Sequence, residues 1–337
     1  MWRVGVNWVG RCDGCGMKPR LIIHIGTHKT GTTSLQSAMS LQSEALAAAG
    51  FCYPASGTTR TNVIKKTNPL LKKHLLLTTS AADPDESLFA AEHARLMQEF
   101  AASGQTTMVL SEEGLSGPGF LKHNGLARVQ HFAGDFDIHI VCLVRRQDSF
   151  VESLWNQRCK MGKVQAHIDT YADNPLIREH MNYTVMLDRW ASLGAVKVIG
   201  FEAAIKTGLE ATFSDVTGIP LVPSKQRNVS PSMTCAAVMA VLSRMGYADV
   251  DWRQLQAALG PDGPKRALGS RLRQKLLADY AQVNDQLFTR YGVEFPQDMP
   301  DEPAEMLPVP TRQDVERMVD AMKLVKKPTG PAPAPGG

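Results

Sequence analysis

The sequence predicts an α/β fold in which helices cover both faces of a central, mainly parallel sheet, with further helices added toward the C-terminus. Two observations lead to this three-layer α/β/α prediction. Short apolar runs typical of buried strands alternate with segments of helical periodicity as far as Pro223. Beyond that residue only helical patterns remain. At 337 residues and 43% hydrophobic composition, the chain can bury a core without disulfides or structural metals.

The elements follow in order along the chain. Residues 21–26 form a continuous apolar run that suits the middle of a parallel sheet. From Thr33, apolar residues recur at helical spacing until Gly50, a residue type that commonly ends helices. Further strands are expected at 51–54, 107–110, 138–144 and 196–201, and further helices at 86–103, 148–159, 176–192, 233–244, 271–290 and 313–325.

Both ends of the chain are expected to lie outside the folded part. We expect residues 1–16 to be a disordered extension, residues 17–326 to form a single domain with helical additions after 232, and residues 327–337 to be a disordered tail. No window reaches the roughly 18 uncharged apolar residues of a membrane helix, and the N-terminus has no signal-peptide pattern. A cytoplasmic protein without stable membrane insertion is therefore expected.

Charge and cysteine usage exclude several classes of protein. A net charge of +4 and a pI near 8.7 are too mild to indicate a nucleic-acid partner, and they suit a small anionic ligand. Cys52 and Cys142 lie in apolar runs, where cysteine is commonly a small buried hydrophobe. Cys12 and Cys15 form a Cys-x-x-Cys pair, but no second pair of zinc ligands follows at matching spacing. We therefore expect no metal site.

The loop between the first strand and the first helix is suited to binding an anion. It reads Gly-Thr-His-Lys-Thr-Gly-Thr-Thr-Ser over residues 26–34. Gly26 and Gly31 allow consecutive backbone N–H groups to point inward, beside the positive end of the following helix. The threonine hydroxyls add donors, and Lys29 adds a mobile positive charge. The pattern predicts a phosphate-binding loop and hence a sheet like that of P-loop NTPases.

The position of the lysine separates two kinds of phosphate loop. In nucleoside triphosphatases the lysine directly follows the second glycine, and the next hydroxyl binds magnesium. Here Lys29 precedes Gly31, Thr32 follows it, and no apolar strand ending in aspartate is evident. We therefore expect a ligand whose transferred group is neutralised by protein cations, without a metal.

A second signature lies farther along the chain, where an apolar strand runs into Arg145 and the next helix carries Ser153. An arginine at the carboxyl end of a parallel strand faces the ligand crevice, and its planar fork suits a dianionic phosphate. Together with the loop, this pattern resembles the sulfotransferase family, particularly its bacterial members, over residues 21 to about 232. That family transfers a sulfuryl group from 3′-phosphoadenosine-5′-phosphosulfate (PAPS).

The resemblance implies a set of donor-binding residues: His28, Lys29, Thr30, Gly31, Thr32 and Thr33 at the 5′-phosphosulfate, and Arg145, Ser153 and Arg227 at the 3′-phosphate. Many members carry proline where this chain has Gln147. Whether Arg145 or Arg146 contacts the phosphate is therefore left open, although Arg146 is expected to be a solvated surface charge.

The resemblance also implies a base that takes the proton of the attacking hydroxyl or amine. Glu112 and Glu113 follow the strand at 107–110, and Glu113 fits better the Ser-x-Glu pattern of carbohydrate-acting members. One of the two glutamates is expected to be a loop charge or a helix-entry residue. His28 is a competing candidate, whereas His24 is expected to be structural.

The implied activity is sulfuryl transfer from PAPS to an acceptor hydroxyl or amine, with a carbohydrate or another small molecule as the expected acceptor and no metal required. Two alternatives are a P-loop kinase acting on small molecules, which would need ATP and magnesium, and a non-catalytic nucleotide-binding module. The oligomeric state has no signature in the sequence.

Overall fold

The computed structural model describes residues 18–58, 72–79, 86–122, 125–223, 230–247, 250–260, 263–298 and 305–322. The chain divides into two compact units that alternate along the sequence. The first unit comprises residues 1–145, 182–226 and 283–295, and the second comprises 146–181, 227–282 and 296–337. The expectation of a single domain over 17–326 stays a prediction. Residues 1–16, with Cys12 and Cys15, and the tail 327–337 lie outside the described residues.

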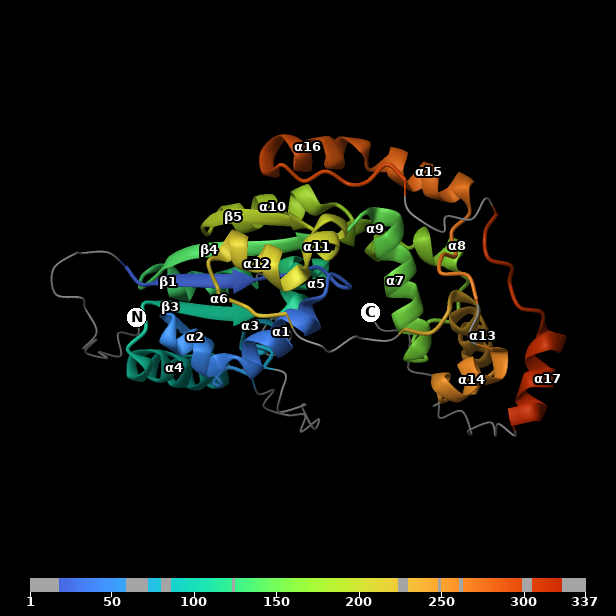
Figure 1. Ribbon diagram of the computed structural model, residues 1–337, viewed down its shortest axis with the longest axis horizontal. Coiled ribbons are helices and arrows are strands. Elements are labelled where there is room, and N and C mark those ends of the chain that lie inside the picture. The colour runs from blue at the N-terminus through green and yellow to red at the C-terminus, as the bar shows by residue number, and fades with distance from the viewer. Residues whose placement is uncertain are drawn as a thin grey trace. The chain divides into compact units, whose positions relative to one another are not determined.

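The first unit is built on a five-stranded sheet in the order β2-β3-β1-β4-β5, and every adjacent pair is parallel (Figure 1). The central strand β1 pairs with β3 on one side and β4 on the other, with His24 level with Ser111 and Val141. The loop after β1 therefore emerges between the ends of β3 and β4, where open α/β sheets bind ligands. The strands are β1 (Arg20–His24), β2 (Phe51–Cys52), β3 (Thr107–Ser111), β4 (Asp137–Val144) and β5 (Ala195–Gly200).

Side chains of the central strands alternate between two separate cores, one on each face of the sheet. Ile22 and Val109 pack with α1 (Thr32–Leu41), α11 (Phe201–Thr207) and α12 (Leu209–Thr217). Leu21 and Ile23 pack on the other face with α4 (Glu86–Ser103), α6 (Leu126–Ala133), α10 (Tyr183–Ala191) and α16 (Ala281–Tyr291). This arrangement confirms the predicted α/β fold with helices on both faces. Cys52 and Cys142 are buried, as predicted.

Three segments predicted as single helices are each interrupted. The segment 33–50 contains α1 and α2 (Ser43–Ala48), and Gln42 between them bonds both the N–H and the carbonyl of Val222 through its side chain, each at 2.9 Å. The segment 176–192 contains α9 (Pro175–His180) and α10, and the chain passes from the second unit to the first between them. The segment 271–290 contains α15 (Ser270–Asp279) and α16.

Among its described residues the second unit contains helices and loops but no strand, and its part beyond Pro223 agrees with the loss of strand signal there. Its helix α7 (Gln147–Lys160) packs against α13 (Met233–Arg244) and α15 and buries the predicted apolar stripe of Phe150, Val151, Leu154 and Trp155. The other helices of this unit are α8 (Ile168–Ala172), α9, α14 (Trp252–Leu259) and α17 (Arg312–Met322). Among the residues described, no helix of either unit is long and apolar enough to cross a membrane.

Candidate functional site

The base of the loop after β1 is fixed to the neighbouring strand β4. The N–H of Ile25 donates to the carbonyl of Val141 at 2.9 Å, and the N–H of Thr27 donates to the carbonyl of Leu143 at 3.1 Å. The Thr27 hydroxyl donates to the same Leu143 carbonyl at 2.9 Å, and the Thr30 hydroxyl donates back to the Thr27 carbonyl at 2.6 Å. The loop is therefore held in one shape before any ligand binds.

Two residues near the tip of this loop have left-handed backbone conformations. Gly31 has φ 78° and Lys29 has φ 68°, and Lys29 is the only non-glycine residue with positive φ in the described ranges. Such a conformation costs a residue with a side chain about 1–2 kcal/mol. Turns of this kind direct successive backbone N–H groups to one side and form anion-binding concavities. The sequence led us to expect Gly26 and Gly31 to curl the backbone; the second left-handed residue is instead Lys29.

Both glycines of the loop occupy places where a side chain does not fit. A Cβ on Gly26 would lie 2.6 Å from the Thr32 Oγ1 and 2.7 Å from the His24 Nε2, and a Cβ on Gly31 would lie 2.4 Å from Cδ2 of Leu209. The Thr32 hydroxyl and the His24 Nε2 are buried without a hydrogen-bond partner among the described atoms. The Thr32 hydroxyl and the His24 Nε2 therefore face the space that remains open because residue 26 is a glycine.

His24 lies beneath the loop as an uncharged imidazole. Its ring is fully buried, and its Nδ1 lies 2.9 Å from the hydroxyl of Ser111 at the end of β3. Burial lowers its pKa to about 4, although the negative charge of Glu113 acts in the opposite direction. The structure thus agrees with the structural role expected for His24.

On the β3 side, the two consecutive glutamates have different environments. The Glu112 side chain is 5% exposed, and its carboxylate accepts from the N–H of Gly114 at 3.1 Å, so that it caps the short 3-10 helix η1 (Glu113–Ser116). The Glu112 N–H donates to the carbonyl of His24 at 3.1 Å. Glu112 is therefore the helix-entry residue of the pair, while Glu113 points toward the loop.

Glu113 lies between two groups that can carry positive charge. Its Oε2 is 3.8 Å from Nδ1 of His28, and its Oε1 is 3.5 Å from Nζ of Lys73. Burial raises the pKa of the Glu113 carboxyl, but His28 and Lys73 outweigh that effect and lower the pKa to about 2. Glu113 is therefore a firmly ionised carboxylate whose two oxygens face different partners.

Lys73 was not assigned a role from the sequence, where it belongs to a Lys-rich stretch. The adjacent His74 fixes its position: the His74 N–H donates to the Ser111 carbonyl, and the Ser111 N–H donates to His74 Nδ1, both at 3.0 Å. This pairing extends the edge of β3 and brings Lys73 next to Glu113. The Lys-rich composition alone contained no signal for this placement.

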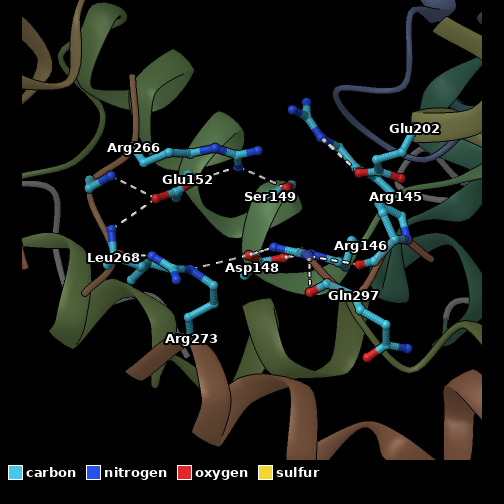
Figure 2. A network of polar contacts seen from close by, with 12 residues as sticks. Arg145, Arg146, Asp148, Ser149, Glu152, Glu202, Arg266, Leu268, Arg273 and Gln297 are labelled. Carbon is cyan, nitrogen blue, oxygen red and sulfur yellow. Dashed lines mark hydrogen bonds and ion pairs between the residues drawn. The ribbon is translucent and has the colours of Figure 1, made fainter. Parts of the chain in front are cut away.

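On the β4 side, Arg145 is tied to the loop. Its guanidinium donates to the carbonyl of Lys29 at 3.0 Å and lies 5.1 Å from the centre of the Phe201 ring. It also approaches the buried carboxylate of Glu202 at 3.8 Å (Figure 2). The hydroxyl of Tyr183 donates to the Arg145 carbonyl at 2.7 Å. Phe201 and Glu202 were missed from the sequence, although they follow β5 at the same edge of the sheet and could have been found on that ground.

The expectation that Arg146 is a solvated charge is wrong. Arg146 is 1% exposed and forms a paired contact with the Asp148 carboxylate at 2.6 and 2.7 Å. It also donates to the carbonyls of Pro296 and Gln297, at 2.8 and 3.0 Å (Figure 2). These contacts all lie within the second unit, and they give the buried guanidinium a structural role.

A second buried network on α7 involves Glu152, four residues after Asp148. One of its oxygens accepts from the N–H groups of Ala267 and Leu268 at 2.6 and 2.8 Å, and the other lies 2.9 Å from Arg266 (Figure 2). Arg266 also donates to the Ser149 hydroxyl at 2.8 Å. The network anchors the segment before α15 to α7.

The two remaining predicted donor contacts are not brought into the described site. Ser153 lies on α7 in the second unit, partly exposed beside the buried stripe, as its helical position predicted. Arg227 lies outside the described residues. The structure therefore brings together Lys29, Glu113 and Arg145 around the loop, all in the first unit.

Comparison with known proteins gives structural likenesses only. No family model matches the chain, and no curated protein matches it in sequence. Solved structures similar to it include a sulfotransferase from Alicyclobacillus acidocaldarius, with a TM-score of 0.40, 15% identity, and coverage of 70% of this chain and 99% of that one. Another is the sulfotransferase domain from the curacin biosynthetic pathway, with a TM-score of 0.37, 13% identity, and coverage of 92% and 100%. Both are sulfotransferases.

A third similar structure is from the PezAT chromosomal toxin-antitoxin system of Streptococcus pneumoniae, with a TM-score of 0.28, 11% identity, and coverage of 80% of this chain and 91% of that one. All three TM-scores lie below 0.5, and the function proposed below rests on residues of this chain alone. Within the described residues, no three His, Cys, Asp or Glu side chains gather as a metal site would require. The expectation that no metal is needed stays a prediction.

Proposed function

We propose that this protein is a sulfotransferase that moves the sulfuryl group of PAPS to a hydroxyl or amine of a small-molecule or carbohydrate acceptor. The observation that carries the proposal is the placement of charge around the loop after β1. Lys29 lies within the loop, Arg145 holds it from the β4 side, and Glu113 faces it from the β3 side. This combination of charges suits a donor that is anionic at both its 5′-phosphosulfate and its 3′-phosphate, and an acceptor that must lose a proton.

The loop itself fits the 5′-phosphate end of the donor. The left-handed turns at Lys29 and Gly31 and the start of α1 direct N–H groups toward one place, and the first N–H groups of a helix have no partner within the helix. We propose that the N–H groups of Thr30–Thr33 bind this phosphate. The buried hydroxyl of Thr32 supports the proposal, because it has no hydrogen-bond partner among the described residues.

Lys29 is proposed to stabilise the leaving group. As the bond between sulfur and the bridging oxygen breaks, negative charge grows on that oxygen, and a nearby ammonium stabilises the transition state more than the ground state. Transfer of this kind is governed by positioning and charge neutralisation, by analogy with phosphoryl transfer. The Lys29 backbone has a left-handed conformation and its carbonyl accepts from Arg145, so the position from which its side chain extends is fixed.

Arg145 is proposed to bind the 3′-phosphate that distinguishes PAPS from ATP. A guanidinium has five N–H donors in a fixed plane, so it can hold the loop carbonyl and an anionic group at the same time. Its stacking on Phe201 and its approach to Glu202 restrict its orientation. Ser153 and Arg227 stay predicted contacts of the same phosphate.

The proposal is tested by ligand discrimination. Adenosine 3′,5′-bisphosphate at a hundredfold excess over its dissociation constant should stabilise the protein by about 2.7 kcal/mol. For a protein of this size the melting temperature should then rise by about 4 °C. ATP with magnesium should give a much smaller shift. A larger shift with ATP and magnesium would instead indicate a kinase.

Sulfuryl transfer is measured with ³⁵S-labelled PAPS, in water alone and with a panel of monosaccharides, oligosaccharides, phenols and amines. We expect labelled sulfate to be released slowly in water and a labelled product to form with at least one member of the panel. Binding of the bisphosphate without any release or transfer of label would overturn the proposed activity and leave a nucleotide-binding module.

A further inference from the structure

Three side chains from three different segments meet on the β3 side of the loop. His28 comes from the loop, Glu113 from the start of η1, and Lys73 from the segment that His74 pairs with β3. One carboxylate oxygen faces the imidazole and the other faces the ammonium, at 3.8 and 3.5 Å. All three side chains are about one-quarter exposed, so the cluster is accessible to a substrate.

The environment of Glu113 argues against direct proton abstraction by its carboxylate. A general base works best when its pKa lies near the working pH. His28 and Lys73 outweigh burial and bring the pKa of Glu113 to about 2, which makes its carboxylate a weak base at neutral pH. An imidazole is the side chain suited to accept a proton in this range.

We propose that His28 accepts the proton of the acceptor hydroxyl and that Glu113 and Lys73 are positioning residues that orient it; this inference rests on the proposed sulfotransferase activity. The Glu113 carboxylate faces Nδ1 of His28, and Nε2, on the other side of the ring, is the nitrogen proposed to take the proton. Lys73 engages the other carboxylate oxygen and so keeps Oε2 directed at the ring.

The separation of 3.8 Å between Nδ1 of His28 and Oε2 of Glu113 is an ion-pair distance, longer than a hydrogen bond. Contacts between acid–base partners commonly tighten when the substrate binds. Closure of this contact would fix the imidazole ring, with Nδ1–H held by the carboxylate. The carboxylate then stabilises the positive charge that develops on the ring, as the carboxylate of a Ser-His-Asp triad does.

The step balances as follows. The acceptor oxygen forms a bond to the sulfur of PAPS, while the bond between sulfur and the bridging oxygen breaks. The electron pair of that bond remains on the bridging oxygen of adenosine 3′,5′-bisphosphate, beside Lys29. The acceptor proton passes to Nε2 of His28 and is later released to water. No oxidant, reductant or further reactant is needed.

The charged and titratable groups around His28 come from each neighbouring segment. Lys29 is adjacent in the loop, Glu113 lies on η1, and Lys73 lies on the segment before α3 (Leu76–Thr79). His24, at the end of β1, is held uncharged by its burial. The Glu113 carboxylate, with its pKa lowered to about 2, stays ionised throughout the neutral and mildly acidic range.

The test compares His28→Gln, Glu113→Gln and the double variant in release of label from ³⁵S-PAPS, to water and to the best acceptor of the panel. We expect His28→Gln to lower the rate about 10²–10⁴-fold and to abolish the acid limb of the pH–rate profile. Glu113→Gln should lower it less, and the double variant should be no slower than His28→Gln alone, because Glu113 acts through His28. Added imidazole should restore part of the activity of His28→Ala.

A matched control is His139→Gln. His139 also pairs with a carboxylate, that of Asp137 at 2.9 Å, but it lies near the start of β4, at the opposite edge of the sheet. This variant should keep the wild-type rate and pH profile. The shift in melting temperature with adenosine 3′,5′-bisphosphate should be retained in every variant, which shows that the loop still folds and binds.

The outcomes separate this inference from the proposed function. If the wild-type protein binds the bisphosphate and transfers label, the proposed function stands, whatever the variants do. The role of His28 is then overturned if His28→Gln keeps the acid limb of the pH–rate profile. It is likewise overturned if the fold-losses of rate in His28→Gln and Glu113→Gln multiply in the double variant. It is also overturned if Glu113→Gln is the slower single variant, which would make Glu113 the direct base. Failure of the wild-type protein in both assays refutes the proposed function itself, and the inference with it.

Discussion

Replacement of Gly31 by alanine tests whether the loop depends on both its left-handed backbone and its close packing. At φ 78° an alanine costs about 1–2 kcal/mol, because its Cβ crowds the following carbonyl. Its Cβ would also lie 2.4 Å from Cδ2 of Leu209, the end of a partly exposed side chain, and moving that side chain off its preferred rotamer costs about 0.5–1.5 kcal/mol. We therefore expect Gly31→Ala to destabilise the protein by about 1.5–3.5 kcal/mol.

Gly218 is the matched control, because its φ is 79° and no atom lies within 4 Å of the position that its Cβ would take. Gly218→Ala should cost only the backbone term of about 1–2 kcal/mol. Both variants are compared by thermal and denaturant unfolding and by the shift with adenosine 3′,5′-bisphosphate, which Gly218→Ala should keep and Gly31→Ala should lose.

A double-mutant cycle isolates the contact itself. Leu209→Ala removes the atom that the new Cβ would meet, so Gly31→Ala should cost about 0.5–1.5 kcal/mol less in that background. Equal losses of stability in Gly31→Ala and Gly218→Ala, or no relief by Leu209→Ala, would refute the steric part of this reasoning. Normal nucleotide binding by Gly31→Ala would refute the assignment of the loop.

Three further predictions concern other parts of the molecule. His24 and His74 are buried with pKa values of about 4, below the ordinary 6.5, so their contribution to stability is complete above pH 6.5 and is lost as the pH falls toward 4. Each should cost about 2 kcal/mol of unfolding free energy by pH 5, and equal stability at pH 7.5 and pH 5 would contradict this. Glu152→Ala should cost about 3–5 kcal/mol in calorimetry, because it leaves Arg266 and two N–H groups buried without their partner; a loss below about 1 kcal/mol would speak against the network. Lys29→Ala should lower the transfer rate about 10²–10³-fold with a smaller loss of bisphosphate affinity, and unchanged kinetics would exclude its role at the leaving oxygen.

The centre of the sheet could be predicted from the sequence because β1, β3 and β4 are buried on both faces. Such strands have continuous apolar sequences, and these three strands and the more exposed edge strand β5 lie within one or two residues of their predicted positions. Helix ends were predicted less well. The helix predicted from Thr33 is interrupted at Gln42, whose side chain bonds the backbone of Val222, 180 residues away, a contact that no local pattern reveals.

Within the site, the sequence predicted which strand ends carry charge but not how each charge is used. Arg145 and Arg146 are adjacent and chemically identical, yet one lies over Phe201 and the other is buried against Asp148, Pro296 and Gln297. The burial of Arg146, which distinguishes it from Arg145, depends on contacts with residues about 150 positions away in the chain. The sequence also does not reveal that Lys29 has a left-handed backbone, because residue preference alone favours glycine in that conformation.

The backbone conformation of Lys29 bears on how this protein could be engineered. A glycine would adopt φ 68° without the cost that the lysine incurs, so Lys29→Gly should raise thermal stability while removing the ammonium. A library screened only for heat resistance would therefore enrich variants that lack the Lys29 ammonium, which the proposed transfer needs. Screens for robust variants of this protein need a turnover assay from the first round.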